Sequence, residues 1–454
     1  MSKPTPTLEM TQGPLARSIL IFSLPLILSN LLQVLFNMSD VAVVGRFAGS
    51  DSLGAVGCTS QFVYLFTSFL IGMGSGINVL VARHAGSGHQ KNAQDTASTA
   101  LTLSLGLGVC ITLLGIFFSR PILTLFGTRP ELMDKAVLYV RIYFLGAPGM
   151  ALYNYGNAVY DAIGNTRKPL LCLAFSGVLN ILLNLFLVII CRLDVAGVAI
   201  ASAVSQLTAA LLLLFFLHRD TDLLRPQAML RPSLPLVRRL LSIGLSSGFQ
   251  MAVFPLANLF IQSGVNSFDA VMVAGNAAAA NADGIVYDVM AAFYTACASF
   301  MGQNYGAGKT RRVRQSFRIS LAFSFGIGLF LGLALYLAGP LFLSLFTTDP
   351  AVVACGMERM RIMCFSYAVS AFMDCTIAAS RSLGYTGVPT FIVIMGSCVF
   401  RILWVKTIFA HFHTIPSLYL LYIFSWALTA AFELLYFFRV RRHALDRLEK
   451  GLQL

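Results

Sequence analysis

Long apolar stretches alternate with short polar breaks along the whole chain. Each stretch is close to 20 residues or longer, which is the length that a helix needs to cross roughly 30 Å of hydrocarbon. The pattern predicts twelve membrane-spanning helices, six in each half of the chain. In the first half they cover residues 16–44, 53–81, 93–118, 136–162, 169–191 and 196–217. In the second half they cover residues 237–265, 275–300, 317–345, 357–380, 389–410 and 416–440.

The composition agrees with a polytopic membrane protein. Hydrophobic residues make up 57% of the chain, charged residues only 11%, and the mean hydropathy is +0.77, a load that a soluble domain of this size does not carry. The nine cysteines are scattered through apolar segments without a CxxC pair, so we interpret them as small core residues. Residues 1–12 are polar and lack the features of a cleavable signal peptide, so the first span is expected to direct insertion.

The two halves of the chain repeat one another. Residues 81–170 align without a gap with residues 301–390, at a fixed offset of 220 positions. The matched pairs include Gly86 with Gly306, Gly106 with Gly326, Gly108 with Gly328, Arg141 with Arg361, and Pro169 with Pro389. An offset that holds over such a length indicates a duplicated unit, which is a common construction in membrane transporters.

The distribution of Lys and Arg predicts that both termini are cytoplasmic. Most basic residues lie in the tails and in the loops that would share their side, near residues 82–92, 164–168, 218–239, 302–318 and 381–388. This is the asymmetry of the positive-inside rule, and it also accounts for the net charge of +13. Because the basic residues border spans and form no separate basic face, we expect no nucleic-acid partner.

An even number of spans in each copy gives both copies the same orientation in the membrane. Their relating pseudo-two-fold axis then runs along the membrane normal. We therefore predict an all-α membrane protein of two six-helix bundles that face a central cavity and rock to give alternating access. The predicted parts are an N-lobe at 1–217, a polar, proline-rich cytoplasmic linker at 218–236, a C-lobe at 237–440 and a cytoplasmic tail at 441–454.

Asp40 in the first span is the main candidate for chemistry. A charge at mid-membrane costs on the order of 2.5–3.5 kcal/mol on insertion scales, so an acid there usually serves a function. A carboxyl group removed from water can take up and release a proton or bind a cation. The structural alternative is that Asp40 lies near the outer end of the span, solvated close to Arg46. Pro25 in the same span leaves a backbone carbonyl unpaired and is the candidate hinge.

Polar residues of the fifth and sixth spans add to this candidate site. Asn180 and Asn184 are four residues apart and hence on one helix face, and Ser202 lies in the next span. Two amides inside a membrane must find partners. A hydrogen bond between helices would also explain them without a role in transport.

Further polar residues within the spans are predicted to line a substrate cavity, namely Gln33, Asn37, Asn154, Gln250, Asn258, Asp288, Asp374 and Arg401. The polar residues of the seventh span form one stripe, which consists of Gln250, Asn258, Gln262 and Asn266. Such a stripe is better suited to line water than to face lipid. Asp374 and Arg401 could instead neutralise one another as a structural ion pair. Asp283 lies near a span entrance and is expected to be solvated.

Taken together, these features resemble the multidrug and toxic compound extrusion family. The resemblance covers residues 10–440 and rests on the 6+6 plan, on Pro25, Asp40 and Gly45, and on the Asn180–Asn184 spacing. The paired turns GSG and GAG, and the runs GNTRKP and GYTGVP, also fit. The family implies export of cationic or amphipathic drugs against an inward flow of H⁺ or Na⁺, without a resident cofactor.

The resemblance also assigns roles to individual residues. Asp40 occupies the place of the coupling aspartate, and Asn180 matches an asparagine of the family's span five. Asn184 stands where the family has an aspartate, and Ser202 where it has a threonine. Tyr139 is similar in position to a span-four tyrosine that hydrogen-bonds this cluster. One carboxylate favours H⁺ over Na⁺, while weak Na⁺ binding at Asp40, Asn180 and Asn184 stays open because amide and hydroxyl oxygens suit hard cations.

Other functions are weighed against this one. The runner-up is a lipid-linked precursor flippase of the same wider group, which several arginines facing the lobe interface would favour. A membrane-embedded enzyme is disfavoured because no span carries HExxH or GxSxG, and a channel because there is no repeated filter or charge ring. We expect a monomer in a bacterial inner membrane that carries drug-like or lipid-like small molecules and contacts membrane lipid.

Overall fold

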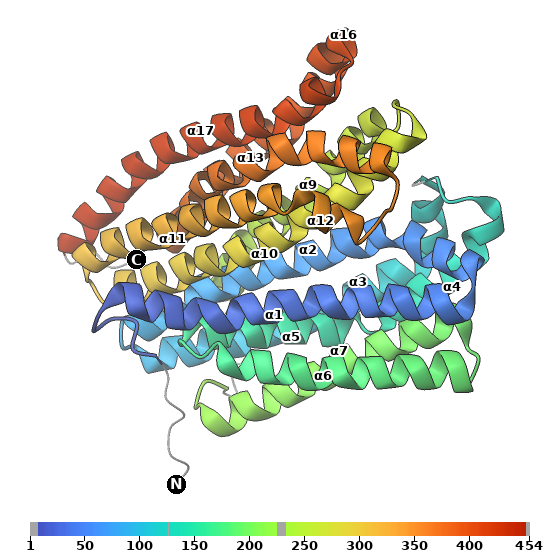
Figure 1. Cartoon of the computed structure of the whole chain (residues 1–454). Helices are drawn as coiled ribbons and strands as arrows, with labels where there is room; N and C mark the ends of the chain where they lie inside the picture. The colour runs from blue at the N-terminus through green and yellow to red at the C-terminus, as the bar shows by residue number, and fades with distance from the viewer. Residues whose placement is uncertain (1–7, 126, 225–232, 451–454) are drawn as a thin grey trace. The chain divides into compact units, whose positions relative to one another are not determined.

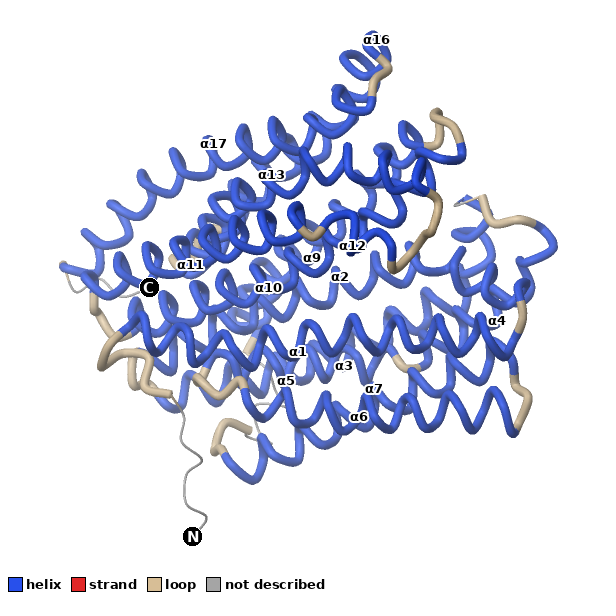
Figure 2. The backbone as a smooth tube through the Cα atoms, viewed as in Figure 1, coloured by secondary structure: helices blue, strands red, loops and turns tan. Residues whose placement is uncertain are grey.

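The computed structural model describes residues 8–125, 127–224 and 233–450. Within these residues every regular element is a helix and none is a strand (Figure 2). In the same residues, eleven helices are long and apolar enough to cross a membrane, and one bent pair of helices brings the number to twelve. The predicted all-α membrane class and the span count are thereby confirmed.

The first half of the chain contains seven α-helices within the described residues. They are α1 (Leu15–Val43), α2 (Ser50–Gly86), α3 (Gln90–Leu125), α4 (Pro130–Leu145), α5 (Ala147–Ala162), α6 (Arg167–Leu185) and α7 (Asp194–Asp220). Two short π-helical segments extend α1 and α6, namely η1 (Val44–Ala48) and η2 (Phe186–Ile190).

The second half begins with the long helices α9 (Leu234–Val265), α10 (Ala270–Gly306) and α11 (Thr310–Leu337). They are followed by the short α12 (Gly339–Ser344) and the long α13 (Pro350–Ser382). The next span, 387–412, is assembled from α14 (Gly387–Val393), η3 (Ile394–Val399), α15 (Phe400–Trp404), η4 (Val405–Phe409) and α16 (Ala410–Phe412). The last helix is α17 (Ile415–Glu449), which begins with a capping box between Thr414 and Ser417.

The fourth predicted span, 136–162, is broken in the structure. α4 and α5 meet at Gly146 with a bend of 46°. Gly146 lies so close to α7 that a Cβ there would be 2.7 Å from its backbone, and Pro148 stands in the first turn of α5, where it needs no amide hydrogen. The second copy has Ser366 and Ala368 at these positions, and its α13 is continuous. The bend is therefore a difference between the two copies that the repeat alone does not predict.

Several helices extend beyond the predicted span ends. α7 reaches Asp220 and α9 starts at Leu234, so helix takes both ends of the predicted linker 218–236, of which residues 225–232 lie outside the described residues. α17 continues to Glu449, so the predicted tail 441–454 is helical up to that point. Hydropathy marks only the part of a helix that lies in lipid, whereas the backbone hydrogen bonds of the helix continue into water.

Contacts divide the chain into two compact units. The first contains Leu8 and Leu28–Gly248, and the second contains Glu9–Ile27 and the residues from Phe249 onward. The division passes through α1 and α9, so each of these helices contributes to both units. These units follow contacts and not the repeat, and the lobes at 1–217 and 237–440 remain a prediction.

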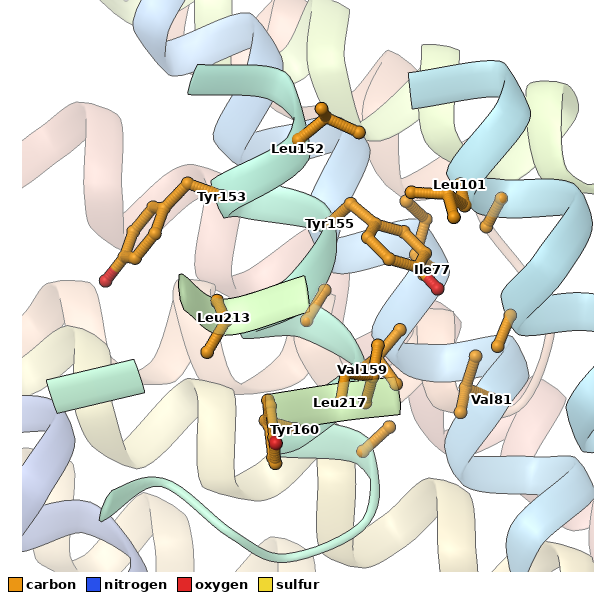
Figure 3. Packing of buried hydrophobic residues seen from close by; sticks show 14 of the residues in the cluster. Ile77, Val81, Leu101, Leu152, Tyr153, Tyr155, Val159, Tyr160, Leu213 and Leu217 are labelled. Carbon is orange, nitrogen blue, oxygen red and sulfur yellow. The ribbon is translucent and has the colours of Figure 1, made fainter. Parts of the chain in front are cut away.

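The centre of the first unit is α5, which packs against α2, α3 and α7. Figure 3 shows Tyr153 and Tyr155 leaving opposite sides of α5, with Tyr155 directed toward Ile77 and Leu101 in the apolar core. Tyr155 is fully buried. Tyr153, on the other side of α5, belongs to the same buried cluster and also lines the cavity described below. α6 lies beside α7 (Figure 1).

The second unit is built around α13, which packs against α10, α11 and α17. Small residues allow close approach at these contacts. A Cβ at Gly332 of α11 would lie 2.0 Å from the carbonyl oxygen of Cys364 in α13, so only glycine fits there. This arrangement of small residues at helix crossings is typical of helices that pack in lipid.

Candidate functional site

The first unit contains a cavity of about 420 Å³ that is lined by residues of α1, α2, α4, α5, α6 and α7. Its walls are mainly aromatic, aliphatic and amide side chains, including Phe36, Tyr64, Tyr139, Tyr143, Tyr153, Gln33, Asn37, Asn154 and Gln206. Among the described residues that line it, Asp40 is the only acid, and there is no Lys, Arg or His. The cavity can therefore offer one negative charge within largely apolar and neutral polar walls.

Asp40 is held in this wall by two hydrogen bonds from other helices. The amide Nδ2 of Asn184 in α6 donates to Oδ1 of Asp40 over 2.5 Å. The hydroxyl of Ser202 in α7 donates to Oδ2 of Asp40 over 3.0 Å. Each carboxylate oxygen thus has its own donor, which favours the ionised form and compensates part of its burial.

Asn180 completes the cluster through Asn184. The spacing of four residues places both amides on one face of α6, and Nδ2 of Asn184 also lies 3.1 Å from Oδ1 of Asn180. Asn184 is fully buried, and its Oδ1 accepts no hydrogen bond from any described residue. The predicted group of Asp40, Asn180, Asn184 and Ser202 is therefore one connected set of side chains in the structure.

Tyr139 lies in the same cavity but does not bond to this cluster. Its ring stacks on Tyr143, one turn further along α4, with centroids 5.8 Å apart. Within the described residues there is no hydrogen bond between Tyr139 and Asp40. The predicted hydrogen bond of Tyr139 is thus not present in this conformation.

Three further residues predicted for the substrate cavity, Gln33, Asn37 and Asn154, are found in its lining. Asn154 donates to the carbonyl of Met150 in its own helix, which fixes the amide at the wall. The sequence reasoning missed Tyr143 and Gln206. Both stand four residues after a predicted site residue, Tyr139 or Ser202, so helical spacing was a signal that could have found them.

The remaining predicted cavity residues, Gln250, Asn258, Asp288, Asp374 and Arg401, lie in the second unit and outside this lining. Gln250 is buried and accepts a hydrogen bond from Arg381, whereas Asn258 is exposed, so the predicted polar stripe of α9 does not share one environment. Asp288 and Asp374 are half-buried.

The proposed Asp374–Arg401 ion pair is not formed. Among the described residues, Asp374 has no cationic nitrogen within 4 Å. Nε of Arg401 donates to the hydroxyl of Ser425 over 3.0 Å, and the guanidinium lies over the ring of Tyr422, 4.8 Å from its centroid. Aromatic rings and a hydroxyl thus surround the buried cation in place of the carboxylate.

The expectation that Asp283 is simply solvated was wrong. Asp283 forms an ion pair with Arg359, and it also accepts a hydrogen bond from the hydroxyl of Tyr367. Arg359 is buried and donates in addition to Asn276. Arg359 stands 220 positions after Tyr139, so the two residues occupy equivalent positions of the repeat. At this position the first copy has a tyrosine of the cavity, whereas the second copy has an arginine whose charge Asp283 neutralises.

Pro25, the predicted hinge, lies inside α1, which runs as one helix from Leu15 to Val43. The contact-based division of the chain falls two residues later, between Ile27 and Leu28. Among the described residues, no group of three or more His, Cys, Asp or Glu is arranged to hold a metal ion.

Comparisons with known proteins agree with this architecture. The family model described as MatE matches residues 25–186 and 247–405. A probable multidrug resistance protein, YpnP of Bacillus subtilis, is 29% identical over 79% of this chain and 80% of its own length. An FAD transporter of Shewanella oneidensis is 27% identical over 76% of this chain and 77% of its own length.

The fold comparison gives the same result. A solved structure of a multidrug resistance MATE family transporter of the MOP superfamily, in an outward-facing conformation, has a TM-score of 0.89 at 22% identity, with 99% of this chain and all of that chain covered. This chain therefore has the fold of that solved structure.

The family match covers more than half of the chain. This chain belongs to the MatE family of multidrug efflux transporters, as the sequence resemblance predicted.

Proposed function

We propose that this protein exports cationic or amphipathic small molecules in exchange for H⁺ by alternating access. The observation that carries the proposal is the cavity wall, in which Asp40 is the single charged residue among aromatic and amide side chains. Such a wall attracts an organic cation through one carboxylate and several π-faces, and it recognises the rest of the molecule loosely. The relative YpnP, a probable multidrug resistance protein, supports the export of drug-like molecules.

Proton exchange at Asp40 supplies the coupling in this proposal. When Asp40 is ionised, it accepts from Asn184 and Ser202 and can pair with a cationic substrate. When Asp40 is protonated, it loses its negative charge and one acceptor oxygen. The cationic substrate then loses its counter-charge, and Asn184 and Ser202 donate to a weaker acceptor. The proton and the substrate therefore exclude one another at Asp40. A membrane potential of about 100 mV contributes roughly 2.3 kcal/mol per proton moved inward.

The local geometry favours H⁺ over Na⁺. Asn184 presents its amide nitrogen, a donor, to Asp40, and Asn180 uses its oxygen to accept from that same amide. A Na⁺ ion requires oxygen ligands, so it would require the Asn184 amide to turn its oxygen toward Asp40. Weak Na⁺ binding at Asp40, Asn180 and Asn184 is the alternative that the test below separates.

The test is dye export from proteoliposomes with an imposed pH gradient, with and without a Na⁺ gradient. The Asp40→Asn variant is expected to lose pH-driven export of a fluorescent organic cation by at least tenfold. Asp51→Asn, which changes an exposed carboxylate in the first turn of α2, is the matched control and should export normally. Unchanged export by Asp40→Asn, or export that follows Na⁺ alone, would overturn the proposed coupling.

Anionic substrates receive less support. A lipid-linked precursor or a flavin dinucleotide carries phosphate groups, and the cavity lining offers no arginine, lysine or histidine to bind them. The flippase alternative and an activity like that of the FAD transporter relative are for this reason not our proposal.

We further propose that the protein is a monomer in a bacterial inner membrane, with both termini in the cytoplasm. The excess of Lys and Arg in one set of loops supports cytoplasmic termini. The bacterial relatives support a multi-pass protein of a bacterial inner membrane, and exposed apolar side chains on the helices supply its contact with lipid. A monomer suffices because the described cavity is complete within one chain.

A further inference from the structure

Three side chains at the turn between α10 and α11 hold the segment that precedes α1. Arg312 donates through Nη1 to the carbonyl of Gly13 over 2.9 Å, and through Nη2 to the carbonyls of Gln12 over 3.0 Å and Met10 over 3.1 Å. Lys309 donates from Nζ to the carbonyl of Thr11 over 2.8 Å. Every carbonyl from residue 10 to residue 13 therefore accepts a hydrogen bond from this turn.

Asn304 supports the arginine from within the second unit. It is fully buried, donates to the carbonyl of Met10 over 3.1 Å and accepts from Nε of Arg312 over 3.0 Å. Arg312 thus uses all of its nitrogen atoms in a fork of fixed geometry, which a lysine cannot reproduce. We call Asn304, Lys309 and Arg312 the clamp, and residues 10–13 the strap.

The strap is shaped to be held in this way. Met10 is buried at 1% exposure, so its side chain anchors the start of the strap. Gly13 has φ +69°, a left-handed conformation that glycine adopts without strain, and Pro14 then leads into α1 at Leu15. The turn of the strap and the start of the helix are thereby fixed together.

Only the second copy of the repeat has the clamp residues. The positions that correspond to Asn304, Lys309 and Arg312 in the first copy are His84, His89 and Asn92. His84 is instead 2.8 Å from the hydroxyl of Thr96. The duplicated turn is thus shared, whereas the donors that reach the strap are specific to one copy.

The clamp extends into the first turns of α1. Ile19 and Phe22 are buried, and the ring of Phe22 meets that of Phe300 in α10 edge to face, with centroids 5.5 Å apart. Residues 9–27 accordingly belong to the second unit, whereas α1 continues from Leu28 in the first unit, where it carries Asp40. One helix therefore joins a segment fixed on the second unit to the candidate coupling carboxylate.

We propose that the clamp holds the beginning of α1 on the second unit so that a change at Asp40 drives the transport cycle, and that Arg312 is its main positioning residue. The inference rests on the proposed function. A helix transmits a displacement only if one of its ends is held, because a free end would follow the movement of the other. Arg312 touches neither proton nor substrate, and it acts by giving α1 this fixed end.

Purified protein in detergent and in proteoliposomes tests the proposal. Arg312→Ala is expected to lower the maximal rate of pH-driven dye export at least tenfold, with the KM for the dye unchanged within twofold. Binding of the dye in detergent and the pH dependence of that binding should remain as in the wild type. Hydrogen exchange of the amides in residues 15–22 should become faster. Arg312→Lys should be intermediate, since it keeps the charge but not the fork.

Arg311→Ala is the matched control, because Arg311 is the exposed neighbour and is not part of the clamp. It should leave rate and exchange unchanged. If Arg312→Ala does not fold, Lys309→Met removes one bond to the strap and should lower the rate in the same way. The inference is overturned if the clamp variants export at the wild-type rate, or if dye binding and its pH dependence are lost with the rate. If the wild type itself shows no pH-driven export, the proposed function is refuted, and the role of the clamp is refuted with it.

Discussion

Asn184 and Asp40 lie 144 positions apart in the sequence, and the amide nitrogen of the first is 2.5 Å from a carboxylate oxygen of the second. This bond joins α6 to α1. Because Asn184 donates here, it binds the ionised carboxylate more strongly than the protonated group, and the contact between the two helices depends on the charge of Asp40.

A second carboxylate at this place should change the coupling ion. We expect Asn184→Asp to make export dependent on Na⁺, because two carboxylates at hydrogen-bonding distance repel one another until a cation or a proton lies between them. The measurement is dye export at constant pH over a range of Na⁺ concentrations. Asn281→Asp, at an exposed position of α10, is the control. A variant that exports at the same rate with and without Na⁺ would contradict this prediction.

Removal of the Ser202 hydroxyl should remove one of the hydrogen bonds that stabilise the ionised form of Asp40. A hydrogen bond to a charged group contributes about 1.5–3 kcal/mol, which corresponds to about tenfold or more in the balance between the ionised and protonated forms. We expect Ser202→Ala to move the pH profile of export toward higher pH. Ser205→Ala is the matched control, since Ser205 lines the same cavity but donates to Ala201 in its own helix. Equal profiles for the two variants would refute the role given to Ser202.

The ion pair of the second unit should matter for stability. Arg359→Met leaves the half-buried Asp283 without its cation, and the cost is at most about 3–5 kcal/mol, the cost of breaking a fully buried ion pair. We expect a clear fall in the unfolding temperature in detergent, and partial recovery in the double variant Asp283→Leu/Arg359→Met. Arg120→Ala removes an exposed pair with Asp134 and should change stability by at most about 1 kcal/mol. A double variant as unstable as the sum of the single ones would argue against direct coupling.

The repeated glycines should differ in tolerance. A Cβ at Gly108 would lie 2.6 Å from the backbone of Pro148, whereas a Cβ at Gly106 meets nothing within 4 Å. We expect Gly108→Ala to destabilise the protein by about 1–3 kcal/mol through overpacking. Gly106→Ala should leave the unfolding temperature unchanged or raise it, because alanine favours helix. Thermal unfolding of the two variants under one condition decides this.

Much of the fold follows from hydropathy alone. Apolar stretches of membrane-spanning length predicted twelve spans, and the bent pair of α4 and α5 completes this number. The connection among Asp40, Asn180 and Asn184 was also foreseeable in part, because helical spacing put the two amides on one face and lipid leaves polar groups few partners.

The remainder depends on contacts between distant segments. No local sequence pattern pairs Asp283 with Arg359, because the two residues lie on different helices. In the sequence each of them appears as an isolated charge. The same holds for Arg401, whose aromatic and hydroxyl partners come from α17 and not from Asp374. The bend between α4 and α5 lies where Gly146 approaches the backbone of α7 and where Pro148 begins the next helix, and hydrophobic periodicity reports neither feature.

Apart from the buried side chain of Met10, the strap before α1 is held through its main-chain carbonyls. Peptide carbonyls are the same in every residue, so evolution can exchange the side chains of Thr11 and Gln12 freely without losing the bonds. Among related chains, the mark of this attachment would be the retention of Asn304, Arg312 and the glycine at position 13. The side chains at positions 11 and 12 would look unselected, although the anchorage of the helix depends on the carbonyls of these two residues.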